Sequence, residues 1–183
     1  MRLNSSIYKS LFLVGPMGVG KTTVGKLLAR ELSLTFHDSD QEIEVRAGTD
    51  ISWIFDVEGE SGFREREVKV IDELTQLPNI LLSTGGGCIL SQANRAALKS
   101  RGVVVFLNTS LDIQEVRTKK DQKRPLLRGV DRRAVLAEMK TFRDPLYQEV
   151  ADIKVFVGES NSKRVVANIV DKLVEQDFVE DID

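Results

Sequence analysis

Residues 15–22 have the types and the spacing of a site that holds phosphate. Gly15, Gly20, Lys21 and Thr22 follow the P-loop pattern Gly-x-x-x-x-Gly-Lys-Thr, with a strand-like apolar run before it and a helical pattern after it. Glycines let backbone N–H groups turn around an anion, and the helix N-terminus adds positive potential. Lys21 can then reach the phosphates, and Thr22 can bind Mg²⁺. The motif predicts nucleoside triphosphate binding by a switch GTPase, an ATPase motor or a small-molecule kinase. A plain glycine turn with a capping threonine is the alternative.

Two carboxylates, Asp38 and Asp40, lie one residue apart where the second expected strand ends. A P-loop protein needs a carboxylate that holds magnesium, usually at the end of another strand. Of the strands after the phosphate motif, only this one ends in an acid, so Asp38 is the candidate. The alternative is that Asp38 only caps a turn. A switch GTPase is disfavoured because Asn108 is followed by Thr-Ser, and the guanine-reading pattern Asn-Lys-x-Asp is absent.

Two further stretches indicate a site for an acceptor. Arg64 and Glu67 are three residues apart in a helical pattern and share a face, although an isolated pair of this kind favours a solvated surface salt bridge. Gly85, Gly86 and Gly87 follow an apolar strand. Consecutive glycines are costly unless the backbone must turn unusually or let something approach closely. At the carboxyl end of a strand we expect a ligand, with an irregular turn as the alternative.

Positive charge is concentrated in residues 117–133, where Arg124 precedes a proline. Long basic segments in such folds can close over phosphates as a lid and exclude water. A solvated helix face is the alternative, which the glycine and the Arg-Pro break within the run make less favourable. Arg143 stands just before Pro145, within or near the end of a helical segment. The net charge of the whole chain is −2, so we expect no nucleic-acid partner.

Strand and helix patterns alternate along the chain, which positions these residues. Short apolar, β-branched runs predict strands at 10–14, 34–37, 80–83, 103–107 and 153–157. Helical patterns lie at 22–32, 61–76, 92–100, 111–119, 132–149 and 162–176. Residues 40–60 break the rhythm and predict one or two short inserted helices. The alternation predicts an α/β domain of three layers with a buried parallel sheet, whose ligands bind beyond the carboxyl ends of the strands.

Length and composition limit the other possibilities. The 183 residues suit one domain. One cysteine and one histidine exclude an internal disulfide and disfavour a zinc site built from protein ligands alone. No apolar run has the length of a signal-peptide core or a membrane span, so we expect a cytoplasmic protein without a membrane partner. We expect poor order in the first eight residues and in the acidic tail 177–183.

In this order along the chain, the motifs resemble those of the shikimate kinase family. They are the P-loop 15–23, Asp38-Ser-Asp40, Phe63-Arg64-x-x-Glu67, Ser83-Thr-Gly-Gly-Gly87, Arg124-Pro-Leu-Leu127 and Arg143-x-Pro-Leu-Tyr147. Together they span nearly the whole chain, and the stretches DSDQEIE and FDVEGESGFR are similar to the enterobacterial form. The resemblance implies a nucleoside-monophosphate-kinase-like fold around a five-stranded parallel sheet. It also implies transfer of the ATP γ-phosphoryl group to the 3-hydroxyl of shikimate, with Mg²⁺, on the path to chorismate and the aromatic amino acids.

The resemblance also implies roles for residues and segments. The chain 1–183 would be one P-loop kinase domain with an acceptor-binding segment at about 40–68 and a lid at about 119–131. The implied catalytic residues are Asp40, Lys21 and Arg124. The implied nucleotide-binding residues are Gly15, Gly18, Val19, Gly20, Lys21, Thr22, Thr23, Arg117 and Arg124. The implied shikimate-binding residues are Asp40, Arg64, Glu67, Gly86, Gly87 and Arg143. The implied metal ligands are Thr22 and Asp38. The family weakly suggests a monomer.

Two other hypotheses remain open at this stage. One is a different small-molecule kinase, for gluconate or a nucleotide. A neutral acceptor would not require two arginines at its site, and a nucleotide acceptor would need a larger pocket than residues 40–60 suggest. The other is a nonenzymatic nucleotide-binding module that holds a partner through its basic segment, which the acidic overall charge and the intact Asp38, Asp40 and Arg64 set disfavour.

Overall fold

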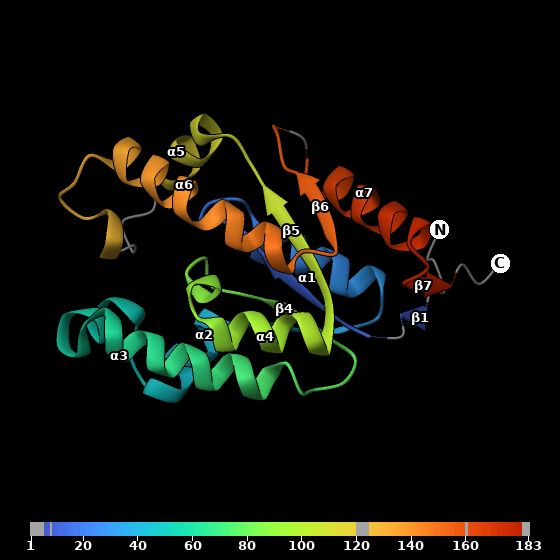
Figure 1. The fold of residues 1–183 in the computed structure, drawn as a ribbon, viewed down its shortest axis with the longest axis horizontal. Helices are drawn as coiled ribbons and strands as arrows, with labels where there is room; N and C mark the ends of the chain where they lie inside the picture. Colours follow the sequence, from blue (N-terminus) through green and yellow to red (C-terminus); the bar gives the residue numbers. More distant parts are fainter. Residues whose placement is uncertain (1–5, 8, 120–124, 160, 181–183) are drawn as a thin grey trace.

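A five-stranded parallel sheet forms the centre of the structure, a computed structural model that describes residues 6–7, 9–119, 125–159 and 161–180 (Figure 1). The strand order is β3-β4-β2-β5-β6. These strands are β2 Ser10–Val14, β3 Thr35–Asp38, β4 Ile80–Ser83, β5 Gly102–Asn108 and β6 Ile153–Phe156. The helices are α1 Lys21–Glu31, α2 Ser39–Ala47, α3 Ile51–Leu74, α4 Gln92–Arg101, α5 Leu111–Lys119, α6 Arg132–Val150 and α7 Ser162–Glu175, with short 3-10 helices η1 Cys88–Leu90 and η2 Pro125–Leu127.

Helices cover both faces of the sheet, as the near-continuous apolar strands predict. All five residues of β2 are buried. Leu11 and Leu13 point to the face covered by α1 and α7. Phe12 and Val14 point to the opposite face, where α3, α4 and α6 pack. Alternate residues of a strand point to opposite faces, so one short strand contributes to two hydrophobic cores. The predicted three-layer α/β fold is confirmed.

The parallel register brings the carboxyl ends of the strands to one edge of the sheet. Leu11 of β2 is paired with Leu81 of β4 on one side and with Val103 of β5 on the other. The glycine-rich loop, the two carboxylates and the three glycines therefore emerge side by side. Figure 1 shows α2, the start of α3 and η2 gathered toward this edge.

The elements around residues 35–74 differ from the sequence prediction in their boundaries. Strand β3 includes Asp38, and α2 begins at once at Ser39, with Asp38 as its N-cap. Helix α3 consists of two helices that meet at a sharp kink at Gly59, so the helix expected at 61–76 begins just after this kink. Helix α2 and the first part of α3 are the short inserted helices expected within residues 40–60. Gly59 has φ 72°, a left-handed conformation that glycine adopts without the penalty of a Cβ. The chain can therefore kink there and continue as a helix.

Parts of the two ends for which we expect poor order pair with each other in a two-stranded sheet. Strand β1 Ser6–Ile7 pairs antiparallel with β7 Val179–Glu180. Val179 is 4% exposed and packs in the core that includes α1 and α7, which explains why this part of the acidic tail is held. Residues 1–5 and 181–183 lie outside the described part of the chain. No helix in the described ranges is long and apolar enough to span a bilayer.

Candidate active site

The glycine-rich loop between β2 and α1 has the shape of an anion cradle. Gly15, Gly18 and Gly20 all have positive φ values. Gly15 also needs the absence of a side chain, since a Cβ there would lie 2.2 Å from the carbonyl oxygen of Leu107. Lys21 is buried, and its Nζ donates to the carbonyl oxygens of Gly15 and Pro16 at 2.7 and 2.9 Å. The ammonium is thereby held at the start of α1, where the backbone N–H groups give positive potential.

Asp38 contacts the first turn of α1 from the end of the neighbouring strand. Its Oδ2 accepts a hydrogen bond from the Thr22 hydroxyl at 2.8 Å. Its Oδ1 accepts from the backbone N–H groups of Asp40 and Gln41, which caps α2. The proposed metal carboxylate is therefore also a helix cap, so both readings of Asp38 fit its geometry. A hydroxyl and a carboxylate beside the phosphate cradle are the hard oxygen ligands that Mg²⁺ prefers.

A cavity of about 230 Å³ lies above this loop. Six of the predicted nucleotide-binding residues line it, namely Gly18, Gly20, Lys21, Thr22, Thr23 and Arg117. Gly15 and Val19 do not line it, and the Val19 side chain is fully buried in the core. Arg117 donates to the carbonyl oxygens of Val19 and Gly158, each at 3.0 Å, and so ties the loop to the segment after β6. Arg124 lies outside the described residues.

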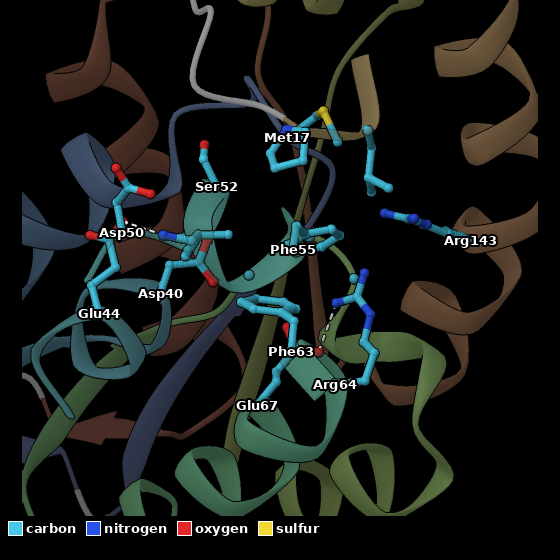
Figure 2. Close-up of a pocket in the computed structure, with 16 residues that line it drawn as sticks. Met17, Asp40, Glu44, Asp50, Ser52, Phe55, Phe63, Arg64, Glu67 and Arg143 are labelled. Carbon is cyan, nitrogen blue, oxygen red and sulfur yellow. Dashed lines mark hydrogen bonds and ion pairs between the residues drawn. The ribbon is translucent and has the colours of Figure 1, made fainter. Parts of the chain in front are cut away.

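A second cavity, of about 310 Å³, adjoins the first (Figure 2). All six of the predicted acceptor-binding residues line it: Asp40, Arg64, Glu67, Gly86, Gly87 and Arg143. In Figure 2, Arg64 and Arg143 lie together on the right of the cavity and Asp40 lies on the left. The sequence-predicted set, drawn from α2, α3, α6 and the turn after β4, is thus brought to one place.

Arg64 pairs with a buried Glu67 side chain, so the pair is not the solvated surface salt bridge of the alternative interpretation. Arg64 Nη1 donates to Glu67 Oε2 at 2.8 Å, and the Glu67 side chain is only 1% exposed. Arg64 Nη2 also pairs with Glu60 at 2.9 Å, at a side chain that is 47% exposed. Arg143, from α6, is 8% exposed. One buried and one partly buried guanidinium therefore face one cavity, an arrangement that suits a carboxylate ligand.

The three glycines after β4 allow close approach from two sides. A Cβ at Gly85 would lie 2.5 Å from Asp40 Oδ1 and 2.9 Å from Glu67 Oε1. A Cβ at Gly87 would lie 2.2 Å from Arg64 Nη2. The Tyr147 hydroxyl donates to the carbonyl oxygen of Gly86 and holds the turn in place. The turn is therefore a wall of the acceptor cavity, against which the acidic and basic side chains rest.

Comparison with known proteins identifies the family. The family model of shikimate kinase matches residues 17–174. A shikimate kinase from Mannheimia succiniciproducens is 55% identical over 164 residues, which cover 89% of this chain and 94% of that protein. The chain belongs to the shikimate kinase family. Its activity is therefore the ATP-dependent phosphorylation of shikimate, in the pathway to the aromatic amino acids.

Solved shikimate kinases share the fold over almost the whole chain. The enzyme from Acinetobacter baumannii, in complex with shikimate, has a TM-score of 0.90 and is 43% identical, covering 92% of this chain and 94% of its own. The enzyme from Aquifex aeolicus has a TM-score of 0.79 and is 37% identical, covering 91% and 97%. The resemblance to this family, read from the motifs, is confirmed.

The electrostatics of this shikimate kinase are unusual at Glu67. Burial raises the pKa of Glu67 to about 7, against the opposing effect of Arg64. Asp40 raises the pKa further and Arg143 lowers it. Nearby, burial raises the pKa of the Cys88 thiol to about 12, so this thiol is neutral. At neutral pH the Glu67 carboxyl group is therefore close to half-protonated.

Sequence reasoning missed several residues of the cavity. Behind the cavity wall, the fully buried Ser39 accepts a hydrogen bond from the Gly85 N–H, a role that its place between Asp38 and Asp40 did not indicate. Phe55 and Phe63 form an apolar wall with ring centroids 5.0 Å apart. Pro125 and Leu126, which follow Arg124, also line the cavity. The aromatic pair at spacing eight in a helical pattern was the one available signal. The contribution of residues 125–126 could not be placed without the fold.

Proposed function

We propose that the protein transfers the γ-phosphoryl group of ATP directly to the 3-hydroxyl of shikimate, with ATP over the glycine-rich loop and shikimate in the larger cavity. One observation carries this proposal. Asp40 lines both cavities, together with Met17, Gly85 and Gly86. A hydroxyl held by Asp40 would therefore face a phosphate held by the loop. That juxtaposition is what direct, in-line transfer requires.

Arg64 and Arg143 are the proposed clamp for the shikimate carboxylate. Planar guanidiniums bind carboxylates through paired, charge-assisted hydrogen bonds. The two side chains come from α3 and α6, so they approach from different elements, and Glu67 supports Arg64 from below. The ring of shikimate would lie against Phe55 and Phe63. Backbone groups of Gly86 and Gly87 would contact its polar substituents.

Asp40 is the proposed partner of the attacking hydroxyl. Its carboxylate would accept a hydrogen bond from the 3-hydroxyl and aim the oxygen at the γ-phosphorus. The transition state of phosphoryl transfer is largely loose, so orientation matters more than base strength. As the new O–P bond forms, the bond between the γ-phosphorus and ADP breaks and ADP leaves. The hydroxyl proton would pass to the Asp40 carboxylate, which returns it to water.

The nucleotide and its metal are assigned to the smaller cavity. Lys21 would contact the β- and γ-phosphates, and Thr22 with Asp38 would hold Mg²⁺. Bound Mg²⁺ would supply neutralisation of the phosphate charge. The described residues contain no cluster of three or more His, Cys, Asp or Glu that could hold a metal alone, which fits an ion bound partly by phosphates. Arg117 borders this cavity and remains our candidate for contact with adenine.

Residues 119–131 are proposed to act as a lid. Arg124 itself is outside the described part of the chain, but Pro125 and Leu126 line the acceptor cavity. Arg128 also contacts Asp56 of α3 at 3.4 Å, a link across the cavity mouth. Closure would bring Arg124 toward the transferred phosphate and exclude water. A single kinase domain, a monomer, a cytoplasmic location and the absence of a nucleic-acid partner stay predictions.

The test is ADP release from Mg-ATP in the presence of shikimate, gluconate, a nucleoside monophosphate or no acceptor. We expect strong stimulation by shikimate alone, and a product phosphorylated at the 3-hydroxyl by NMR. Stimulation by gluconate or a nucleotide would keep the phosphate site and discard the arginine clamp. Bound ATP without stimulation by any acceptor would favour a nucleotide-binding module.

A further inference from the structure

Glu67 is a buried carboxylate with one oxygen still available. Its Oε2 accepts from Arg64 Nη1 at 2.8 Å. Its Oε1 has no hydrogen-bond partner among the residues that the structure describes, and the side chain is 1% exposed. A buried acceptor without a partner is costly for an ionised carboxylate. The same oxygen can carry a proton, because protonation removes the negative charge and changes this oxygen from an acceptor that lacks a donor into an O–H donor.

Charged and titratable groups face Glu67 from every element around it. Its own helix α3 contributes Arg64 and, at the exposed end, Glu60. Helix α2 contributes Asp40, η1 contributes the Cys88 thiol, and α6 contributes Arg143. Asp40 Oδ1 and Glu67 Oε1 both border the space above the Gly85 Cα, so the two carboxylates converge there.

These buried charges are close to balance before any acceptor binds. Two guanidiniums, Arg64 and Arg143, oppose two carboxylates, Asp40 and Glu67. An incoming carboxylate adds one negative charge beside the buried Glu67 and Arg143 side chains, where an uncompensated charge is costly. The carboxylate of the acceptor also competes with Glu67 for interaction with Arg64 and Arg143, the two cations that stabilise ionised Glu67. Both effects disfavour the ionised form of Glu67.

We propose that Glu67 takes up one proton when the carboxylate of the acceptor binds between Arg64 and Arg143, so that binding adds no net charge to the buried site. This rests on the proposed function, because it takes the two arginines as the carboxylate clamp. The step balances simply. A buffer acid gives up a proton, and an O–H bond forms at the Glu67 carboxyl group. Glu67 is thereby a positioning residue, because its protonation adjusts the charge of the site to an anionic acceptor.

Glu67 is suited to this role where its neighbours are not. Its pKa, raised by burial to about 7, leaves it near the point of half-protonation, so a modest added charge shifts the balance. The guanidiniums are already protonated and stay so. Cys88 is a neutral thiol and has no proton to gain. Glu60 is 47% exposed, where water screens the incoming charge.

The test is calorimetry of shikimate binding to the full-length protein without nucleotide, in buffers that differ in ionisation enthalpy. The slope of binding heat against that enthalpy gives the number of protons exchanged. At a pH about one unit above the free Glu67 pKa, we expect uptake that approaches one proton, because the group is ionised before binding. Well below that pKa we expect none. Above it, the Kd for shikimate should rise with pH by at most about tenfold per unit.

Two variants form a matched pair, since both residues contact Arg64. Glu67→Gln should bind shikimate with no proton uptake. Glu60→Gln should keep the wild-type uptake, because its carboxylate faces water. Uptake that persists in a folded Glu67→Gln protein would overturn the proposal and move the proton to another group.

Wild-type protein provides a test that does not depend on variant folding. A shikimate analogue with a hydroxymethyl group in place of the carboxylate should bind more weakly and without proton uptake. Absence of uptake with shikimate at every pH, or equal uptake with the neutral analogue, would overturn the proposal. Absence of any shikimate binding is a different result, since it would remove the proposed acceptor site itself.

Discussion

The Ser39 hydroxyl accepts a hydrogen bond from the backbone N–H of Gly85 at 2.9 Å. Ser39 is fully buried and opens α2, whereas Gly85 opens the glycine turn after β4. The bond therefore fixes the start of α2 against the wall of the acceptor cavity. It also separates the two neighbouring acids, because Asp38 turns to Thr22 and Asp40 to the shared border of the two cavities. One serine thus allows two adjacent carboxylates to serve different sites.

Ser39→Ala should lower stability and turnover together. It leaves the Gly85 N–H buried without its partner, at a cost of about 1–3 kcal/mol in the free energy of unfolding. The loosened α2 should lower kcat more than it changes ATP affinity. Urea unfolding and steady-state kinetics measure both effects. Ser100→Ala is the control, since the Ser100 hydroxyl bonds only within its own exposed helix. Equal behaviour of the two variants would contradict the positioning role of Ser39.

Asp40→Asn should remove most turnover while the protein still binds ATP. The substitution keeps size and shape but removes the charge that orients the acceptor hydroxyl. Because Lys21 and Thr22 hold the nucleotide, the Kd for ATP should change by less than about threefold, which is under 1 kcal/mol. Single-turnover assays and nucleotide titration separate the two quantities. Turnover close to that of the wild type would remove Asp40 from the reaction.

Arg64→Ala should raise the KM for shikimate much more than the KM for ATP. A lost hydrogen bond to a charged group costs about 1.5–3 kcal/mol, which corresponds to roughly ten- to hundredfold in KM. Arg66→Ala is the matched control. Arg66 lies two positions along the same helix but pairs with Glu58 and does not line the acceptor cavity. An unchanged shikimate KM in Arg64→Ala would exclude this residue from the clamp.

Asp38→Asn separates the two roles that the geometry allows this residue. Asparagine caps helices about as well as aspartate, so the free energy of unfolding should stay within about 0.5 kcal/mol of the wild type. Loss of the charge should raise the Mg²⁺ concentration needed for half-maximal activity by about tenfold. Activity measured over a Mg²⁺ titration gives this value. A variant with the wild-type Mg²⁺ dependence would leave Asp38 as a helix cap alone.

Sequence patterns located the sheet closely because its strands are buried on both faces. Runs such as residues 10–14 and 80–83 agree with β2 and β4 at both ends. The expected break between residues 60 and 61 agrees closely with the kink at Gly59, where the two parts of α3 meet. The pairing of β1 with β7 was not predicted, because two-residue strands carry no periodic signal.

The candidate site also contains some residues that the sequence predicts and others that it does not. Glycine, lysine and arginine motifs could be recognised because their spacing is local. The roles of Ser39 and Leu126 could not be recognised, although both lie within motifs, because each role depends on residues distant in sequence. The burial of Glu67 was also invisible, since the same spacing from Arg64 occurs in surface salt bridges. Functional motifs with short spacing can be predicted from the sequence, whereas the burial of a side chain and contacts between distant residues require the fold.

The central place of β2 has a consequence for synthesis on the ribosome. Strand β2 pairs with β4 at Leu81 and with β5 at Val103. Gly15, which follows β2, lies against the carbonyl oxygen of Leu107 at the end of β5. The glycine loop precedes β4 and β5 in the sequence, so the strand before the loop cannot be paired on both sides until residues 80–108 have been synthesised. Such long-range pairing slows folding. We expect nascent chains that end before β5 to bind no ATP.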